Sequence, residues 1–103
     1  MVSVIGDFNG WDGRVHPMRN HNGVWEIFLP QVCPGDLYKF EIVGADGGLV
    51  AKSDPFAFFS QHGPETASII HDLERYTWND GAWMAKRASQ DFYHGPMSIY
   101  EVH

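Results

Sequence analysis

The sequence has few of the residues on which several protein classes depend. Cys33 is the only cysteine among 103 residues, so no disulfide can form within the chain, and we expect a cytoplasmic location. Seven Lys and Arg stand against thirteen Asp and Glu, and the net charge of −6 disfavours binding to nucleic acids or anionic membranes. We also expect no membrane span and no signal peptide, because no apolar run reaches roughly 18–20 residues.

The usual signatures of metal, cofactor and catalytic sites are also missing. Six histidines are present, but no two have the His-x-His or His-x-x-x-His spacing of metal ligands. No serine lies in a Gly-x-Ser-x-Gly elbow, and no glycine-rich phosphate loop is found. We therefore expect no metal, no cofactor and no catalytic residue, and we do not expect this chain to be an enzyme by itself.

Short β-type runs separated by turn residues dominate residues 1–76. Asn22-Gly23 is the strongest hairpin signal, because both residues accept a positive φ. Period-2 alternation is clearest where Tyr38, Phe40 and Ile42 point one way along their strand. The spacing predicts an all-β sandwich with strands at Val2–Ile5, Val24–Leu29, Leu37–Val43, Leu49–Lys52 and Ala67–Ile70.

The tail has a different pattern. We expect residues 77–95 to form a linker with a short helix, in which Asp80 caps a segment containing Trp83. Residues 96–103 predict a further strand over Ser98–Val102 that has no following element to pair with. The chain therefore looks cut at its end, and also at its start, where Val2 is already in a strand.

Aromatic residues make up 15% of the chain, which is more than a small core needs. Trp11 lies in a polar turn, where an indole can stack on a sugar ring, although capping the edge of the sandwich explains it equally well. Lys39 projects from the outward face of its strand and can supply a hydrogen bond, but most such lysines are only solvated. For Trp25, Ile27 and Leu29 a core position is expected instead.

Phe56, Phe58 and Phe59 form a second aromatic group, in the loop that follows Asp54-Pro55. A contiguous apolar patch of this kind is typical of a surface that packs on a neighbouring domain. We therefore interpret these three residues as an interdomain packing surface.

Five segments in order resemble one known family. The segment 2–14, VSVIGDFNGWDGR, with His16-Pro17-Met18-Arg19 after it, is similar to the opening of the family-48 carbohydrate-binding module of bacterial glycogen branching enzymes. The family's order continues in LYKFE (37–41), KSDPFAF (52–58), PETASII (64–70) and PMSIYEVH (96–103). The likeness covers essentially the whole chain.

The resemblance implies an immunoglobulin-like (early-set) β-sandwich over residues 1–76, truncated at the N-terminus. Residues 96–103 would then be the first strand of the (β/α)₈ catalytic barrel of the parent chain. The parent would be a 1,4-α-glucan branching enzyme that cuts an α-1,4 linkage and forms α-1,6 branches in glycogen biosynthesis. Its catalytic carboxylates would lie on later strands, so this chain would be a non-catalytic part.

The resemblance also assigns residues to glucan binding. In relatives such as the β-subunit of the AMP-activated kinase, a Trp and a Lys touch glucan, and they match Trp11 and Lys39 here. A second stacking Trp of those relatives is replaced by Leu49, and an Asn by approximately Ser68. The expected partners are thus α-1,4-glucans such as glycogen and maltooligosaccharides, and the parent's barrel.

Two alternatives remain open at this point. The chain either binds or positions α-glucan, or it is a structural module that packs on the barrel and binds little sugar. The missing first strand also predicts an unpaired sheet edge, which Ser98–Val102 or another copy of the chain would fill to give a strand-paired oligomer.

Overall fold

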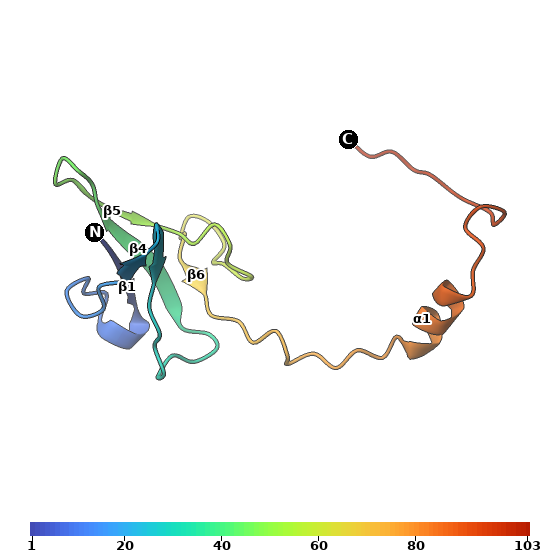
Figure 1. Cartoon of the computed structure of the whole chain (residues 1–103), viewed down its shortest axis with the longest axis horizontal. Helices are drawn as coiled ribbons and strands as arrows, with labels where there is room; N and C mark the ends of the chain where they lie inside the picture. Colours follow the sequence, from blue (N-terminus) through green and yellow to red (C-terminus); the bar gives the residue numbers. More distant parts are fainter. The chain divides into compact units, whose positions relative to one another are not determined.

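The computed structural model describes all 103 residues, which form two compact units, Met1–Asp72 and Leu73–His103 (Figure 1). All strands belong to the first unit, and the only α-helix belongs to the second. The expected all-β character is confirmed to this extent.

One antiparallel sheet forms the centre of the first unit. Its strand order is β1-β4-β5, and β6 pairs with the beginning of β4, beyond the stretch that pairs with β5. The register places Val4 opposite Phe40 and Ile5 opposite Lys39, so the predicted alternation along the central strand is present. The strands are β1 (Val2–Gly6), β4 (Leu37–Val43), β5 (Leu49–Lys52) and β6 (Ser68–Ile69).

A separate hairpin consists of β2 (Arg19–His21) and β3 (Val24–Glu26). Asn22 and Gly23 form its turn with φ values of 52° and 86°, which confirms the prediction from the Asn-Gly pair. The strand was expected to continue to Leu29, but it ends at Glu26. Each strand of this hairpin has only three residues, all of them exposed.

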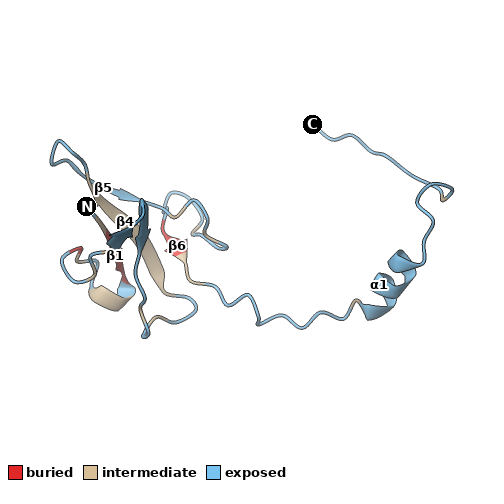
Figure 2. Cartoon of the chain, in the orientation of Figure 1, coloured by how far each residue is buried: buried red, intermediate tan, exposed pale blue.

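The core of the first unit is small (Figure 2). Val4, Ile5 and Ala67 are its buried apolar residues. Trp25 and Ile27 were expected in the core, but their side chains are 38% and 37% exposed. Trp25 lies in β3, whose three residues are all exposed, and Ile27 follows the end of that strand, so no second layer forms here over the sheet.

The outer edge of β1 is not free, which contradicts the expected unpaired edge. Val4 N–H donates to the His16 carbonyl (3.1 Å), and Met18 N–H donates to the Val2 carbonyl (2.8 Å). The segment 16–18 therefore already satisfies backbone groups that another strand would need. Ser98–Val102 is not a strand either, because its backbone has no partner strand. The strand-paired oligomer loses its structural basis.

The second unit contains the helix α1 (Gly81–Ala88). Asp80 occupies the expected N-cap position, but its side chain makes no capping hydrogen bond. The guanidinium carbon of Arg87 lies 5.5 Å from the centre of the Trp83 ring, on the helix surface. No helix of the structure has the length and apolar character that crossing a membrane requires.

Candidate functional site

Trp11 lies in the loop that leaves β1 through the short 3-10 helix η1 (Asp7–Asn9). Gly10 and Trp11 both have a positive φ, 63° and 61°, which turns the chain back toward the sheet. Trp11 N–H donates to the Gly6 carbonyl (3.0 Å), and the indole Nε1–H donates to Asp7 Oδ1 (3.1 Å). The side chain is 38% exposed, so the ring is held on one side and open on the other.

Asn9 fixes this loop from inside. Its Oδ1 accepts the Gly6 N–H (2.9 Å), and its Nδ2 donates to the Val4 carbonyl (2.9 Å). These two bonds define the orientation of the amide, so the contact between Nδ2 and His16 Nδ1 (2.9 Å) makes the imidazole nitrogen the acceptor. Asn9 thus connects β1, the Trp11 loop and the segment at the outer edge of β1.

A close ion pair follows Trp11 in the same loop. Arg14 donates from Nε and Nη2 to the carboxylate of Asp12, with the shortest distance 2.7 Å. These hydrogen bonds, followed by the bond from the Arg14 backbone N–H, lower the pKa of Asp12 to about 2. Asp12 and Arg14 follow Trp11 closely in the sequence. Their charged groups face solvent, where they can form hydrogen bonds.

Lys39 lies in the middle strand of the sheet, on the face that also carries Ile5 and Glu41. Its Nζ donates to Thr66 Oγ1 (2.8 Å). A Cβ atom on Gly13 would lie 1.8 Å from Glu41 Oε1, so the loop that carries Trp11 passes over this same face. The loop that carries Trp11 and the strand that carries Lys39 therefore approach each other at Gly13 and Glu41.

A polar hollow of about 390 Å³ lies beside Thr66, the partner of Lys39. Hydroxyl, amide and carboxylate groups line it, which is the set of donors and acceptors that suits a polyhydroxylated ligand. Its polar lining residues are Ser53, Asp54, Ser60, Gln61, Glu65, Thr66 and Ser68.

Ser68 has a structural role. Its side chain is fully buried, and its Oγ accepts the Asp54 N–H (2.9 Å). Asp54 Oδ2 in turn accepts the Tyr38 hydroxyl proton (2.7 Å). Burial, and after it the bond to Asp54, raises the pKa of Tyr38 to about 12. The Ser68 hydroxyl is therefore engaged within the protein, and Leu49 is 63% exposed and has no aromatic ring.

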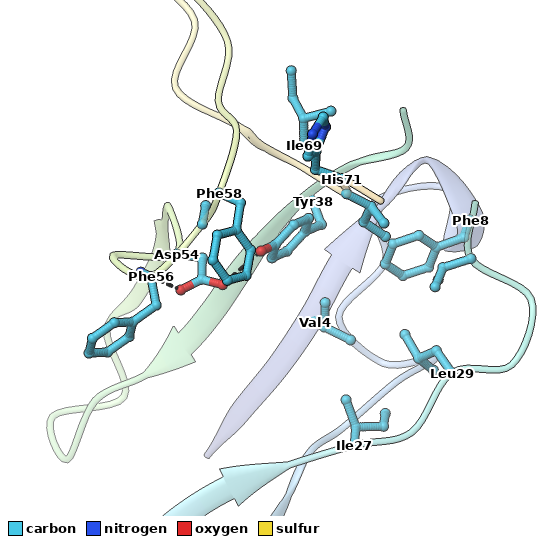
Figure 3. Close-up of a pocket in the computed structure, with 13 residues that line it drawn as sticks. Val4, Phe8, Ile27, Leu29, Tyr38, Asp54, Phe56, Phe58, Ile69 and His71 are labelled. Atoms are coloured by element: carbon cyan, nitrogen blue, oxygen red, sulfur yellow. Dashed lines mark hydrogen bonds between the residues drawn. The ribbon is translucent and has the colours of Figure 1, made fainter. Parts of the chain in front are cut away.

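An apolar hollow of about 350 Å³ lies on the other face of the sheet. Figure 3 shows Phe56 and Phe58 on one side of it and Phe8 and Leu29 on the other. Phe56 and Phe58 are 86% and 73% exposed, and Phe59 is 50% exposed with its ring 5.7 Å from His71. The three expected packing residues are thus on the surface, and two of them line the hollow.

Two residues of the site were not singled out from the sequence. Asp7 bonds the indole of Trp11, and Thr66 bonds Lys39. Asp7 stands four residues before Trp11 in a tight turn, which is a detectable signal, whereas the contact between Lys39 and Thr66 joins distant segments. The structure contains no group of His, Cys, Asp and Glu side chains that could hold a metal ion.

The model of carbohydrate-binding module 48, described as the isoamylase N-terminal domain, matches residues 1–57. The chain belongs to this family. The Trp11 loop and Lys39 both lie within the matched segment, whereas Thr66, the partner of Lys39, follows it.

Relatives similar to the whole chain carry the name 1,4-alpha-glucan branching enzyme GlgB. The relative from Rubrobacter xylanophilus is 61% identical over 103 residues, that from Rhodospirillum rubrum 59% over 105, and that from Synechococcus elongatus 50% over 103. Each match covers 99% of this chain, and the chain spans 13–14% of the length of these relatives.

Proposed function

We propose that this chain is the glucan-binding, non-catalytic region of a 1,4-α-glucan branching enzyme. The observation that supports this most directly is the exposure of Trp11 on a loop whose Gly13 lies against Glu41, on the same face of β4 as Lys39. The relatives' shared name supplies the substrate class, α-1,4-glucan, and the activity of the parent protein.

Stacking is the main expected interaction. The indole of Trp11 contributes an apolar surface for one pyranose ring, at about 1 kcal/mol for such a contact. Lys39 and the polar hollow beside Thr66 provide hydrogen bonds to the hydroxyls. Because Leu49 offers no second ring, a single platform carries the site, and we expect weak binding that becomes useful when glucan is also held elsewhere in the parent.

The finer architecture is also part of the proposal. Residues 1–76 would form the immunoglobulin-like sandwich, residues 77–95 the linker, and residues 96–103 the first strand of the catalytic barrel. In the parent, cleavage of an α-1,4 linkage and transfer to a 6-hydroxyl would use carboxylates of that barrel, so this region contributes binding and positioning in glycogen biosynthesis.

A second role rests on a separate observation. Phe56, Phe58 and Phe59 are all at least half-exposed, and Phe56 and Phe58 line an apolar hollow. Exposed aromatic surface of this kind is suited to packing against the parent's barrel. In this alternative the module positions the barrel and binds little sugar.

Titration of the chain with maltoheptaose separates the two roles. We expect saturable binding that is weakened about fivefold in Trp11→Ala, the equivalent of about 1 kcal/mol, and weakened less in Lys39→Ala. Trp78→Ala is the matched control, since Trp78 is 75% exposed but lies in the second unit. If Trp11→Ala binds as well as the unmodified chain, the sugar-binding proposal is wrong and the packing role is favoured.

A further inference from the structure

Asp7 connects two segments that are thirty residues apart. Its Oδ1 accepts the indole Nε1–H of Trp11 (3.1 Å), and its Oδ2 accepts the backbone N–H of Leu37 (2.9 Å). Both carboxylate oxygens are therefore engaged, one by the Trp11 loop and one by the first residue of β4. Leu37 precedes Lys39 by two residues in the same strand.

We infer that Asp7 is a positioning residue, which holds the indole of Trp11 in a fixed orientation relative to Lys39. The effect on glucan binding rests on the proposed function. The clamp, by which we mean the two hydrogen bonds of Asp7 to Trp11 and Leu37, does not depend on it. Asp7 acts through Trp11 and does not need to touch the sugar.

The chemistry of the three groups requires a carboxylate at this position. The indole Nε1–H and the Leu37 N–H are both donors, and each meets a different oxygen of the Asp7 side chain, so this geometry needs an acceptor at both ends of the group. In Asn at position 7 one of these two donors would face the NH2 group, which is itself a donor, so that bond is lost in this side-chain orientation. Hydrogen bonds to a charged acceptor are also stronger than neutral ones.

The backbone alone leaves the ring free to turn. Trp11 has a φ of 61°, and its N–H is bonded to Gly6, which fixes the backbone of the loop. Rotation about the side-chain bonds is limited by Asp7, because Nε1 is the only polar atom of the indole. Holding the platform in its bound orientation before glucan arrives lowers the entropic cost of binding.

The test compares Asp7→Asn and Asp7→Ala with Asp12→Asn in the full 103-residue chain. Asp12→Asn removes the same charge from the same loop, but the Asp12 carboxylate bonds only Arg14. The first readout is the NMR signal of the indole Nε1–H groups, of which the chain has four. Trp11→Phe identifies the Trp11 signal by its disappearance.

We expect both Asp7 variants to shift the Trp11 indole signal and speed its exchange with water, while the other three indole signals stay in place. Asp12→Asn should leave all four close to their original positions. An unmoved Trp11 signal in both Asp7 variants would overturn the inference. Asp7→Asn guards against a folding defect, because it keeps the size of the side chain.

The second readout is maltoheptaose affinity in a double-mutant cycle. Asp7→Ala should weaken binding about threefold in the unmodified chain and have no further effect in a Trp11→Ala background. An equal loss in both backgrounds would show that Asp7 acts independently of the indole and would contradict the inference. If Trp11→Ala leaves binding unchanged, the proposed function fails, and the indole signal alone decides the clamp.

Discussion

Residues 1–72 and residues 73–103 use their side chains in opposite ways. In the first region, polar side chains bond backbone groups across the chain: Asn9 holds the Trp11 loop, Asp7 reaches Leu37, and Ser68 bonds Asp54. In the second region, hydrogen bonds are mostly within α1 and its following turn, and the large apolar side chains are exposed, with Tyr93 at 96% and Tyr100 at 89%.

The difference shows what each region can do alone. A sheet whose loops are fixed by side-chain bonds can present a rigid binding group such as Trp11. Exposed aromatics on a segment with one short helix gain stability only when other protein covers them. The first region therefore holds its loops in fixed positions by itself, whereas the second exposes apolar side chains that other protein could cover.

The largest expected loss of stability comes from adding a methyl group at Gly6, in the first region. A Cβ at Gly6 would lie 2.3 Å from the Leu37 carbonyl oxygen and 2.8 Å from the Phe8 ring, so the β1–β4 pairing must shift. Gly6→Ala should lower the free energy of unfolding by about 2–3 kcal/mol, measured by urea denaturation.

Gly81→Ala is the matched control in the second region, since nothing lies within 4 Å of its added Cβ. It should leave the unfolding midpoint of the sheet unchanged. A Gly6→Ala chain that unfolds at the original midpoint would show that the close approach of Gly6 to β4 is not needed.

The second prediction compares Asn9, in the short helix η1 of the first region, with Asp80, which precedes α1 in the second. Asn9→Ala removes three hydrogen bonds, to Gly6, Val4 and His16, and should cost about 2 kcal/mol of unfolding free energy. Asp80→Ala removes no capping bond, so it should change the free energy of forming α1 by less than about 0.5 kcal/mol. Both changes in stability are measured by circular dichroism. If Asn9→Ala and Asp80→Ala lose equal stability, the two regions do not differ in this respect.

A pH dependence should reveal the buried network of the first region. The pKa of Tyr38 is raised to about 12, above the ordinary value near 10, so the folded state favours the protonated hydroxyl. This contribution is complete below pH 10 and is lost as the pH rises toward 12, because the unfolded chain loses its proton first. Since Tyr38 is only half-buried, we expect a loss of about 1 kcal/mol, measured as unfolding free energy across this window.

Tyr38→Phe serves as the reference for that experiment. Every other residue is the same in both proteins, so the difference between the two curves isolates Tyr38. Parallel curves between pH 10 and pH 12 would show that the bond from Tyr38 to Asp54 does not favour the protonated form.

The smallest effect is expected at the exposed ion pair. The pKa of Asp12 is about 2 because of its bonds from Arg14, so Arg14→Ala should return it toward about 3.9, as followed by NMR titration. In the unmodified chain the pair's contribution is present above the ordinary pKa and is lost as the pH falls toward 2. In the second region, His94 lowers the pKa of Asp91 in the same way, and that value should not move in Arg14→Ala.

Local patterns predicted the elements that local chemistry controls. The bounds of β4 and β5 follow from alternation and from the Asp46-Gly47-Gly48 turn, and the Asn22-Gly23 hairpin follows from the two positive φ values. The family was equally accessible, because its motifs are contiguous in the sequence. Trp11 and Lys39 were found in this way, and their role in sugar binding stays a prediction.

The predictions that were wrong concern burial and strand pairing, which depend on residues far away in the sequence. Trp25 and Ile27 alternate like core residues, but burial requires a facing layer, which alternation cannot reveal. Ser68 stands near the position of the relatives' Asn, and the sequence could not reveal that its side chain is fully buried and accepts the Asp54 N–H. Ser98–Val102 has strand-forming residues, but a strand forms only where a second backbone accepts its hydrogen bonds.

The sequence by itself determined which segments can be strands, where the chain turns, and that an indole follows a tight polar loop, because these depend on neighbouring residues. Only the tertiary structure decided that segment 16–18 closes the edge of β1, that Thr66 meets Lys39, and that Asp7 links Trp11 to β4. Those contacts join residues far apart in the chain, and hydrogen-bond partners at such separations are selected by the folded backbone, not by local propensity.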